Sequence, residues 1–470
     1  MKKYINTFQK LLILTVAITI SSCSIDEIKP INQLTAENTI RDEESAQKVL
    51  NGVYDLSRAF DISFFPLHLA AYGDEGISTG LSGDAGFNTN EVPVENRFLS
   101  NVYNGHYKVI NIANFLIQEL EAGKAIGISE ERKAEMISEA KFQRAFSYFN
   151  LLRYFGQYYD LNSSYGVVLR TSFATELESS PRSTVQETYN LIESDLEYAA
   201  TNGPVFIEHF YSGSLAAKAL LAKVKLYEGK YGEAATLAEE VINNAEGYSL
   251  EAIYSDIFSN RFDSSEVIFA PFAGPGAEGG TNMYLVSRTN YSEYFRSLAD
   301  MQVGTADDGS LEGLGSDYDP RFSFAYSEET QGANSNGKYP FASNSSSQNN
   351  TLYHLRLGEL YLVHAEALTR SGGNSASALQ SLNTIRDRAG VDPKEFVDVP
   401  TLLEDIRQEK LLELSFENGE PLFDLVRYDV LGNIDASTVK STLNNEYKFI
   451  LPIPSDVLIG NNALVQNPGY

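Results

Sequence analysis

The sequence has no tryptophan and a single cysteine among its 470 residues. Because a disulfide joins two cysteines, an internal disulfide framework is excluded. Basic residues are also scarce: 36 lysines and arginines face 63 aspartates and glutamates, which gives a net charge of −27. Such an acidic surface repels nucleic acid and anionic lipid headgroups. A well-solvated exported protein is the simpler interpretation of this charge, and selection for a cationic ligand is the alternative.

Long hydrophobic runs are missing after residue 22, since no later segment approaches the ~18 continuous apolar residues that indicate a membrane span. One apolar run, residues 11–20, follows the basic residues Lys2 and Lys3 and is too short to span a bilayer comfortably. It leads into small residues and the single cysteine, ISSC at residues 20–23. This layout is typical of a secretory signal peptide, which we assign to residues 1–22.

The ISSC segment resembles a bacterial lipobox. In such signals the chain is cut before the cysteine and the thiol is acylated, which predicts lipidation of Cys23. Two or more acyl chains bury enough methylene groups to anchor a protein stably in the outer membrane. Asp26 and Glu27 follow closely, and acidic residues there resemble the surface-export signal of Bacteroidota lipoproteins. We expect residues 23–34 to be an extended tether.

Beyond the tether the apolar pattern is helical. Apolar residues recur at three- and four-residue steps in two pairs of segments, 217–227 with 234–241 and 357–368 with 376–389. Glycines follow the first segment of each pair, as expected where a helix ends. Repeated hairpins of this kind resemble tetratricopeptide repeats, which stack because one hairpin cannot bury its own apolar face.

Other segments complete one domain over residues 35–470. A helical tract over 100–157 is interrupted near 123–129. Capping-box spacing predicts one helix start near Ser183, where Ser183 with Gln186 and Thr184 with Glu187 both fit, and another at Thr401. Residues 61–95 are rich in glycine and polar residues, which predicts a long loop. We expect a helical part over about 35–250, an irregular part over about 251–352 and a second helical part over about 353–470.

Catalytic and metal motifs are weak. Residues 76–80 match the hydrolase elbow pattern, which needs a strand before it and a helix after it, but a polar glycine-rich loop follows. The five histidines are scattered and none forms a His-Glu-x-x-His zinc motif. Asp74 and Glu75 are adjacent, and neighbouring side chains of an extended segment point apart, unlike a glycosidase pair. We therefore expect no catalytic residue, no metal and no cofactor.

Short segments along the chain carry a family resemblance. In order, they read AKFQRAFSYF at 140–149, ELYLVHAEA at 359–367, ALQSLNTIRDRAG at 378–390, RQEKLLEL at 407–414, FENGE at 416–420, FDLVR at 423–427, LPIP at 451–454 and QNPGY at 466–470. Together with the lipobox they resemble the SusD/RagB family of outer-membrane nutrient-binding lipoproteins. The resemblance implies a mainly α fold, in which tetratricopeptide-like helix pairs form an α-solenoid scaffold with long irregular ligand-binding loops.

The resemblance also implies a function. Such proteins sit on the cell surface, bind nutrient oligomers and deliver them to a SusC-like TonB-dependent channel of the outer membrane. Their ligands are glycans more often than peptides, so an oligosaccharide is the first expectation and a peptide the second. Two other functions remain open from the residues alone: a surface glycoside hydrolase or esterase, and a helical-repeat scaffold with only a protein partner.

Ligand sites in this family are aromatic platforms surrounded by polar side chains. Sugar C–H faces stack on aromatic rings, while amides and carboxylates bond the hydroxyl groups. Two regions offer such residues. The predicted loop and the helix after it contribute Tyr72, Asp74, Phe87, Asn88, Asn90 and Tyr103, and the irregular part contributes Tyr284, Tyr291 and Tyr294.

Overall fold

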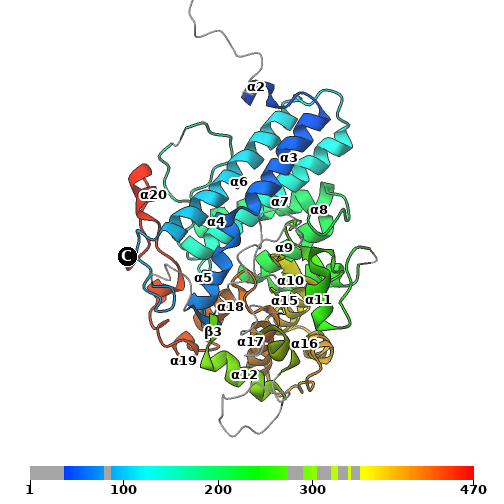
Figure 1. The fold of residues 1–470 in the computed structure, drawn as a ribbon, viewed down its shortest axis with the longest axis vertical. Coiled ribbons are helices and arrows are strands. Elements are labelled where there is room, and N and C mark those ends of the chain that lie inside the picture. Colours follow the sequence, from blue (N-terminus) through cyan, green and yellow to red (C-terminus); the bar gives the residue numbers. More distant parts are fainter. Residues whose placement is uncertain are drawn as a thin grey trace, which may run out of the picture.

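The computed structural model describes residues 36–78, 86–176, 178–244, 246–273, 289–303, 319–326, 337–339 and 350–470. Helices dominate these residues, which confirms the predicted fold class. Three long helices lie side by side at one end of the molecule (Figure 1): α3 (Glu43–Ser57), α6 (Arg97–Glu121) and α7 (Glu130–Phe155). The predicted break near residues 123–129 is the turn between α6 and α7, where Gly123 and Gly127 adopt positive φ.

From α7 onward, helices pack against one another as a stack of hairpins. The stack runs through α8 (Val185–Asn202), α9 (Ser214–Tyr227), α10 (Tyr231–Ile242), α15 (Leu357–Arg370), α16 (Ser375–Ala389), α17 (Val399–Leu414) and α18 (Glu420–Val430). Ala217, Ala234 and Ala238 are fully buried where α9 and α10 cross, so the two backbones approach closely. The two helix pairs predicted from periodicity are confirmed.

The predicted irregular part lies between α10 and α15 in the chain. Its described residues form short elements: α11 (Tyr254–Asn260), η2 (Arg261–Asp263), β2 (Val267–Phe269), β3 (Thr289–Tyr291), α12 (Glu293–Val303) and α13 (Pro320–Tyr326). Two short antiparallel pairings tie this part to the rest of the fold. β3 pairs with β1 (Gly76–Ser78), and β2 pairs with β4 (Leu355–Arg356).

Helix starts follow the predicted caps in one case and differ in the other. The Thr184 hydroxyl accepts from Glu187 N at 3.1 Å, and Glu187 accepts from Thr184 N, so the structure uses the Thr184–Glu187 box of the two predicted near Ser183. The second prediction is wrong by one turn, because α17 begins at Val399 and its N-cap is Asp398. Its carboxylate accepts from Thr401 N at 2.8 Å, so Thr401 lies inside the helix.

The predicted loop over residues 61–95 is wrong in its first part. Residues 60–72 form α4 (Phe60–Ser63) and α5 (Phe65–Tyr72). Every residue of α5 is buried, and a helix that is apolar all round has no polar stripe for periodicity to detect. Residues 86–95 contain turns without helix or strand.

A buried network of charges joins the irregular part to the C-terminal helices. Its centre is Arg356 on β4, which is 1% exposed. The Arg356 guanidinium donates to three carboxylates: Glu266 at 2.7 Å, Glu417 at 2.7 Å and Glu413 at 2.9 Å. These carboxylates also contact Arg321, Lys338 and Arg388. Burial alone would raise the pKa of Glu413, but Arg388 and Arg356 hold it well below its usual range.

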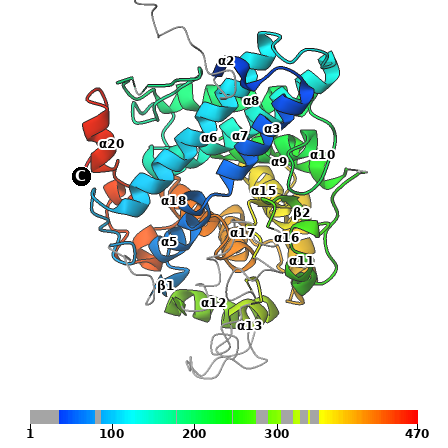
Figure 2. The same ribbon diagram turned by 45° about the horizontal axis from the view of Figure 1, so that its top comes forward.

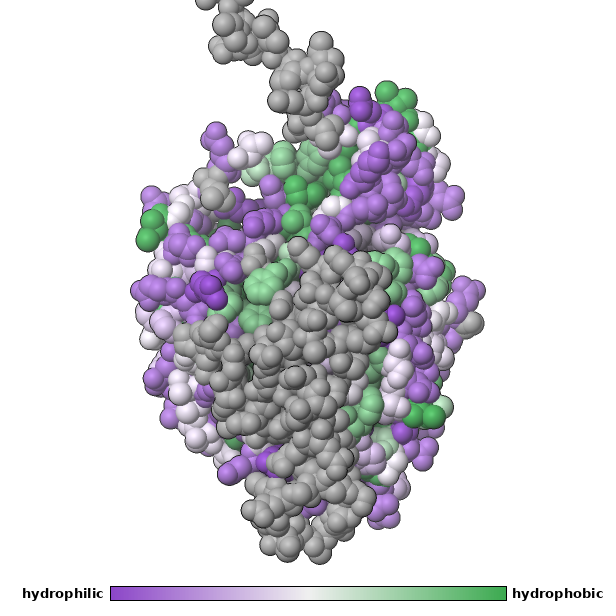
Figure 3. All heavy atoms as spheres, viewed as in Figure 1, coloured by the Kyte–Doolittle hydropathy of each residue, from purple (hydrophilic) through white to green (hydrophobic). Residues whose placement is uncertain are grey.

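The chain ends in short elements that lie against the first half of the fold. These are α19 (Ala436–Val439), η4 (Glu446–Phe449) and α20 (Ser455–Gly460), and α20 contacts α6 (Figure 2). In the described parts of the chain, no helix combines the length and apolarity needed to cross a membrane. Among the atoms coloured by hydropathy in Figure 3, hydrophilic side chains predominate and apolar ones form small groups, in keeping with the charge of the chain.

Candidate functional site

The β1–β3 pairing brings the two predicted ligand-binding regions together. Gly76 pairs with Tyr291, and Ser78 pairs with Thr289. β1 follows α5 directly, and β3 leads into α12, so both regions meet at one edge of the molecule (Figures 1 and 2). We name this region the β1–β3 face and define it by Asp74, residues 76–78, residues 289–294 and their contacts.

Asp74 occupies an unusual backbone position on the β1–β3 face. Its φ is +68°, a left-handed conformation that is uncommon for residues other than glycine. The side chain is 18% exposed and lies 3.7 Å from Lys440 Nζ, which itself donates to Ala71 O at 2.6 Å. Burial raises the pKa of Asp74, and Lys440 opposes that rise. A partly exposed carboxylate held in this way can accept hydrogen bonds from a ligand hydroxyl.

Tyr294 supplies an aromatic ring held by charged neighbours. Its hydroxyl accepts a hydrogen bond from Arg407 Nη2 at 2.5 Å, and the Arg407 guanidinium lies 5.8 Å from the ring centre. Arg407 is in turn fixed by two bonds to Glu404, at 2.6 and 2.8 Å. The half-buried ring is therefore pre-oriented, and its hydroxyl keeps a proton to donate. An oriented ring of this kind offers an apolar surface against which a sugar face can stack.

Three of the predicted loop residues lie in the core instead. Tyr72 and Phe87 are 1% and 0% exposed, and Asn90 is fully buried. The Tyr72 hydroxyl donates to Lys448 O at 2.7 Å, and Asn90 Nδ2 donates to Tyr72 O at 2.9 Å. Side chains in these positions offer almost no surface to a ligand, so their burial does not support the predicted ligand-binding role. Their amide and hydroxyl groups tie α5 to the C-terminal segment. Asn88 is half-buried and stays a prediction.

Tyr103 lines a different hollow, a cleft of about 530 Å³ between α6, residues 168–176 and α20. Its ring lies 4.8 Å from that of Tyr107, and burial raises the pKa of Tyr103. None of the other predicted ligand residues lines this cleft. Polar groups at its edge include Asp456 and Asn461 on and after α20, which sequence reasoning missed because they lie more than 350 residues from Tyr103. A ligand role for Tyr103 remains a prediction.

The remaining predicted residues are less fully described. Tyr291 is placed by its backbone in β3, while Tyr284 and the lipidation site Cys23 lie outside the described residues. Within the described ranges, no group of three or more histidine, cysteine, aspartate or glutamate residues is arranged to hold a metal ion.

Glu75, next to Asp74, is a buried acid whose titration should be measurable. Its Oε2 accepts from Phe416 N, whereas its Oε1 has no partner among the described residues. Burial raises its pKa to about 8, compared with ~4.3 in an unfolded chain. Between these pH values only the folded state holds the proton, so stability falls as pH rises.

We expect Glu75→Gln to weaken that pH dependence. Between pH 5 and pH 8, the free energy of unfolding of the wild type should fall with rising pH more steeply than that of the variant, by up to ~1.4 kcal/mol per pH unit. Urea unfolding of both proteins at several pH values measures the difference. Parallel stability curves would show that Glu75 is already ionised in the folded protein at pH 5.

Comparisons with known proteins agree with this architecture. Residues 315–470 match the SusD family model, and residues 25–226 match a model described as starch-binding and associating with the outer membrane. A SusD-like protein P2 from Formosa agariphila is 25% identical over 100% of both chains. A SusD-like protein from Bacteroides ovatus is 24% identical over 80% of this chain and 76% of its own.

Solved structures show the same fold. A SusD superfamily protein from Bacteroides vulgatus superposes with a TM-score of 0.72 at 23% identity, over 92% of this chain and 100% of its own. A laminarin-binding SusD-like protein superposes with a TM-score of 0.71 at 24% identity, over 92% and 100%. The overall fold therefore recurs across proteins of low sequence identity.

Proposed function

Because the chain belongs to the SusD/RagB family, we propose that it is a non-catalytic surface protein that binds glycans and delivers them to a SusC-like TonB-dependent channel of the outer membrane. The predicted signal peptide would direct its export, and lipidation at Cys23 would anchor it in that membrane. The description of the family model matched by residues 25–226 supports an association with the outer membrane. The channel partner is proposed from family membership.

The observation that carries the binding proposal is the meeting of two distant segments at the β1–β3 face. Asp74 and Tyr294 are separated by more than 200 residues, yet Ser292 and Glu293, just before Tyr294, lie close enough to affect the pKa of Asp74. A carboxylate and an oriented ring in one region offer the two contacts that a sugar needs. We propose that this face is the glycan-binding site.

A glycan is the favoured ligand class for two reasons. The family model over residues 25–226 is described as starch-binding, and a structural neighbour is described as laminarin-binding. Neutral sugars also fit the acidic surface, since they bring no charge to be repelled. Starch and laminarin oligosaccharides are therefore the first probes.

Calorimetric titration of the chain from Ser24 onward tests the ligand class. The panel would hold malto-oligosaccharides, laminarin oligosaccharides, acidic oligosaccharides and mixed peptides. We expect saturable binding of at least one neutral oligosaccharide and no binding of the acidic ones, because a net charge of −27 opposes them. A signal from peptides alone would replace glycans with peptides as the ligand. Release of shorter sugars during the titration would contradict the non-catalytic part of the proposal.

A further inference from the structure

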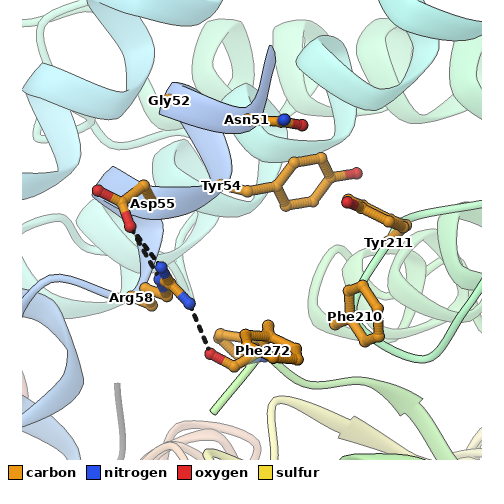
Figure 4. Close-up of a pocket in the computed structure, with 9 residues that line it drawn as sticks. Asn51, Gly52, Tyr54, Asp55, Arg58, Phe210, Tyr211 and Phe272 are labelled. Carbon is orange, nitrogen blue, oxygen red and sulfur yellow. Dashed lines mark hydrogen bonds and ion pairs between the residues drawn. The ribbon is translucent and has the colours of Figure 1, made fainter. Parts of the chain in front are cut away.

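A hollow of about 510 Å³ lies beside α3, away from the elements of the β1–β3 face. Its volume falls within the ~300–1,000 Å³ of small-ligand sites. Figure 4 shows the rings of Tyr54, Tyr211, Phe210 and Phe272 around an open space, with Arg58 and Asp55 on the opposite side. The lining residues come from three separate segments: α3 and its end, residues 210–211, and residues 271–272 after β2.

The aromatic wall of this hollow is held in place by ring contacts. Tyr54 and Tyr211 meet edge to face at 5.1 Å, and Phe210 and Phe272 do so at 5.3 Å. Phe272 is nevertheless 40% exposed, which is unusual for a ring in so many contacts. A fixed, exposed aromatic surface loses little conformational entropy on binding, so it is suited to stacking against a ligand.

The polar side of the hollow is also pre-oriented. Arg58 Nη1 donates to Phe272 O at 2.9 Å and so ties the end of α3 to the aromatic wall. Its Nε and Nη2 donate to Asp55 at 3.0 and 2.6 Å. Asn51, one turn earlier, accepts from Gln47 at 2.9 Å. The Asp55–Arg58 pair has no net charge, which favours a neutral ligand with many hydroxyl groups over an ion.

Gly52 gives a second, independent indication of a ligand. It lies within α3, where glycine is less favourable than any residue except proline. Its φ is not positive, and a Cβ added there would meet no atom within 4 Å. Neither backbone conformation nor packing therefore requires glycine at this position. Gly52 lines the hollow, so a larger side chain at this position would add bulk at its edge.

We propose that this hollow is a second carbohydrate-binding site, which takes a neutral pyranose unit against Phe272 and Tyr211 with its hydroxyls on Asn51, Asp55 and Arg58. The inference rests on the proposed glycan-binding function but on separate residues. A protein with two such sites would hold a long glycan at two points and gain avidity from both.

Glycan-array binding of labelled protein tests the hollow. The variants are Gly52→Leu, which adds a bulky side chain at a residue that lines the hollow, and Gly232→Leu, a matched control in α10 whose added Cβ also meets nothing within 4 Å. Leucine favours the helix more than glycine does, so folding of Gly52→Leu is not endangered. We expect Gly52→Leu to lower the signal of at least one bound glycan about ten-fold or more, and Gly232→Leu to leave every signal unchanged. Phe272→Ala should reproduce the Gly52→Leu pattern.

Each outcome separates the hollow from the β1–β3 face. An unchanged array pattern in Gly52→Leu, with loss in Tyr294→Ala, overturns the second site and leaves the proposed function standing. Loss in Gly52→Leu alone supports the hollow and overturns the β1–β3 face. Absence of any glycan signal in the wild type overturns both. A peptide-array signal that only Gly52→Leu removes would make the hollow a peptide site and overturn it as a carbohydrate site.

Discussion

Replacing Arg356 with methionine should lower the free energy of unfolding by about 3–5 kcal/mol. The side chain is 1% exposed, and methionine keeps much of its length but none of its donors. Glu266, Glu413 and Glu417 would each lose a bond of 2.7–2.9 Å. Because water cannot reach them, these carboxylates would remain close together with less positive charge to balance them.

Lys48→Met is the control for the Arg356 substitution. Lys48 pairs with Glu44 at 2.7 Å, but its side chain is 71% exposed. Exposed pairs one helical turn apart contribute only ~0.3–0.5 kcal/mol, so little change is expected. Urea unfolding followed by circular dichroism measures both variants. A loss below about 1 kcal/mol for Arg356→Met would mean that the neighbouring arginines and lysine compensate for it, and that the network is not needed to hold the irregular part on the helices.

Replacing Tyr294 with alanine should weaken glycan binding about ten-fold or more, which corresponds to a loss of at least ~1.4 kcal/mol. The substitution removes the apolar surface for a sugar face and the hydroxyl held by Arg407. Asp74→Asn should weaken binding in the same direction, since a neutral amide is a poorer acceptor for sugar hydroxyls than a carboxylate. Calorimetry with the best oligosaccharide of the panel measures both changes.

Tyr165→Ala is the matched control for Tyr294→Ala. Tyr165 is also half-buried, with the Arg182 guanidinium 5.3 Å from its ring centre, but it lies between α7 and α8. The affinity of the Tyr165→Ala variant for the oligosaccharide should stay within about two-fold of that of the wild type.

Gly460→Leu tests the Tyr103 cleft, because an added Cβ there meets nothing within 4 Å and the residue lines the cleft. Loss of affinity in Gly460→Leu but not in Tyr294→Ala would move the glycan site to that cleft.

The helical scaffold could be predicted from local patterns because its helices are amphipathic. α9, α10, α15 and α16 each carry an apolar stripe, and a stripe is visible in the sequence alone. α5 was missed because all of its residues are buried and no polar face interrupts the apolar run. The start of α17 was misplaced because Asp398 and Thr401 both offer cap chemistry, and the structure uses the first.

The site was harder to predict than the fold, since its residues meet through long-range contacts. The strands that unite Asp74 with Tyr294 have three residues each, too few to show an alternating pattern. Residue type alone also could not separate Tyr72, which bonds Lys448 O in the core, from Tyr294, which stays half-buried beside Arg407. The sequence alone could not identify Gly52 as a residue that lines a hollow, because the other walls of the hollow are formed by segments more than 150 residues away.

The most direct test of glycan binding at the β1–β3 face is a crystal structure of the chain from Ser24 onward with the best oligosaccharide of the panel. We expect a pyranose ring against Tyr294 with a hydroxyl within hydrogen-bonding distance of Asp74. Density for a second pyranose ring in the hollow beside Gly52 would support the proposed second carbohydrate-binding site. Sugar density confined to the Tyr103 cleft, or to a surface that includes neither Asp74 nor Tyr294, would contradict the proposed site.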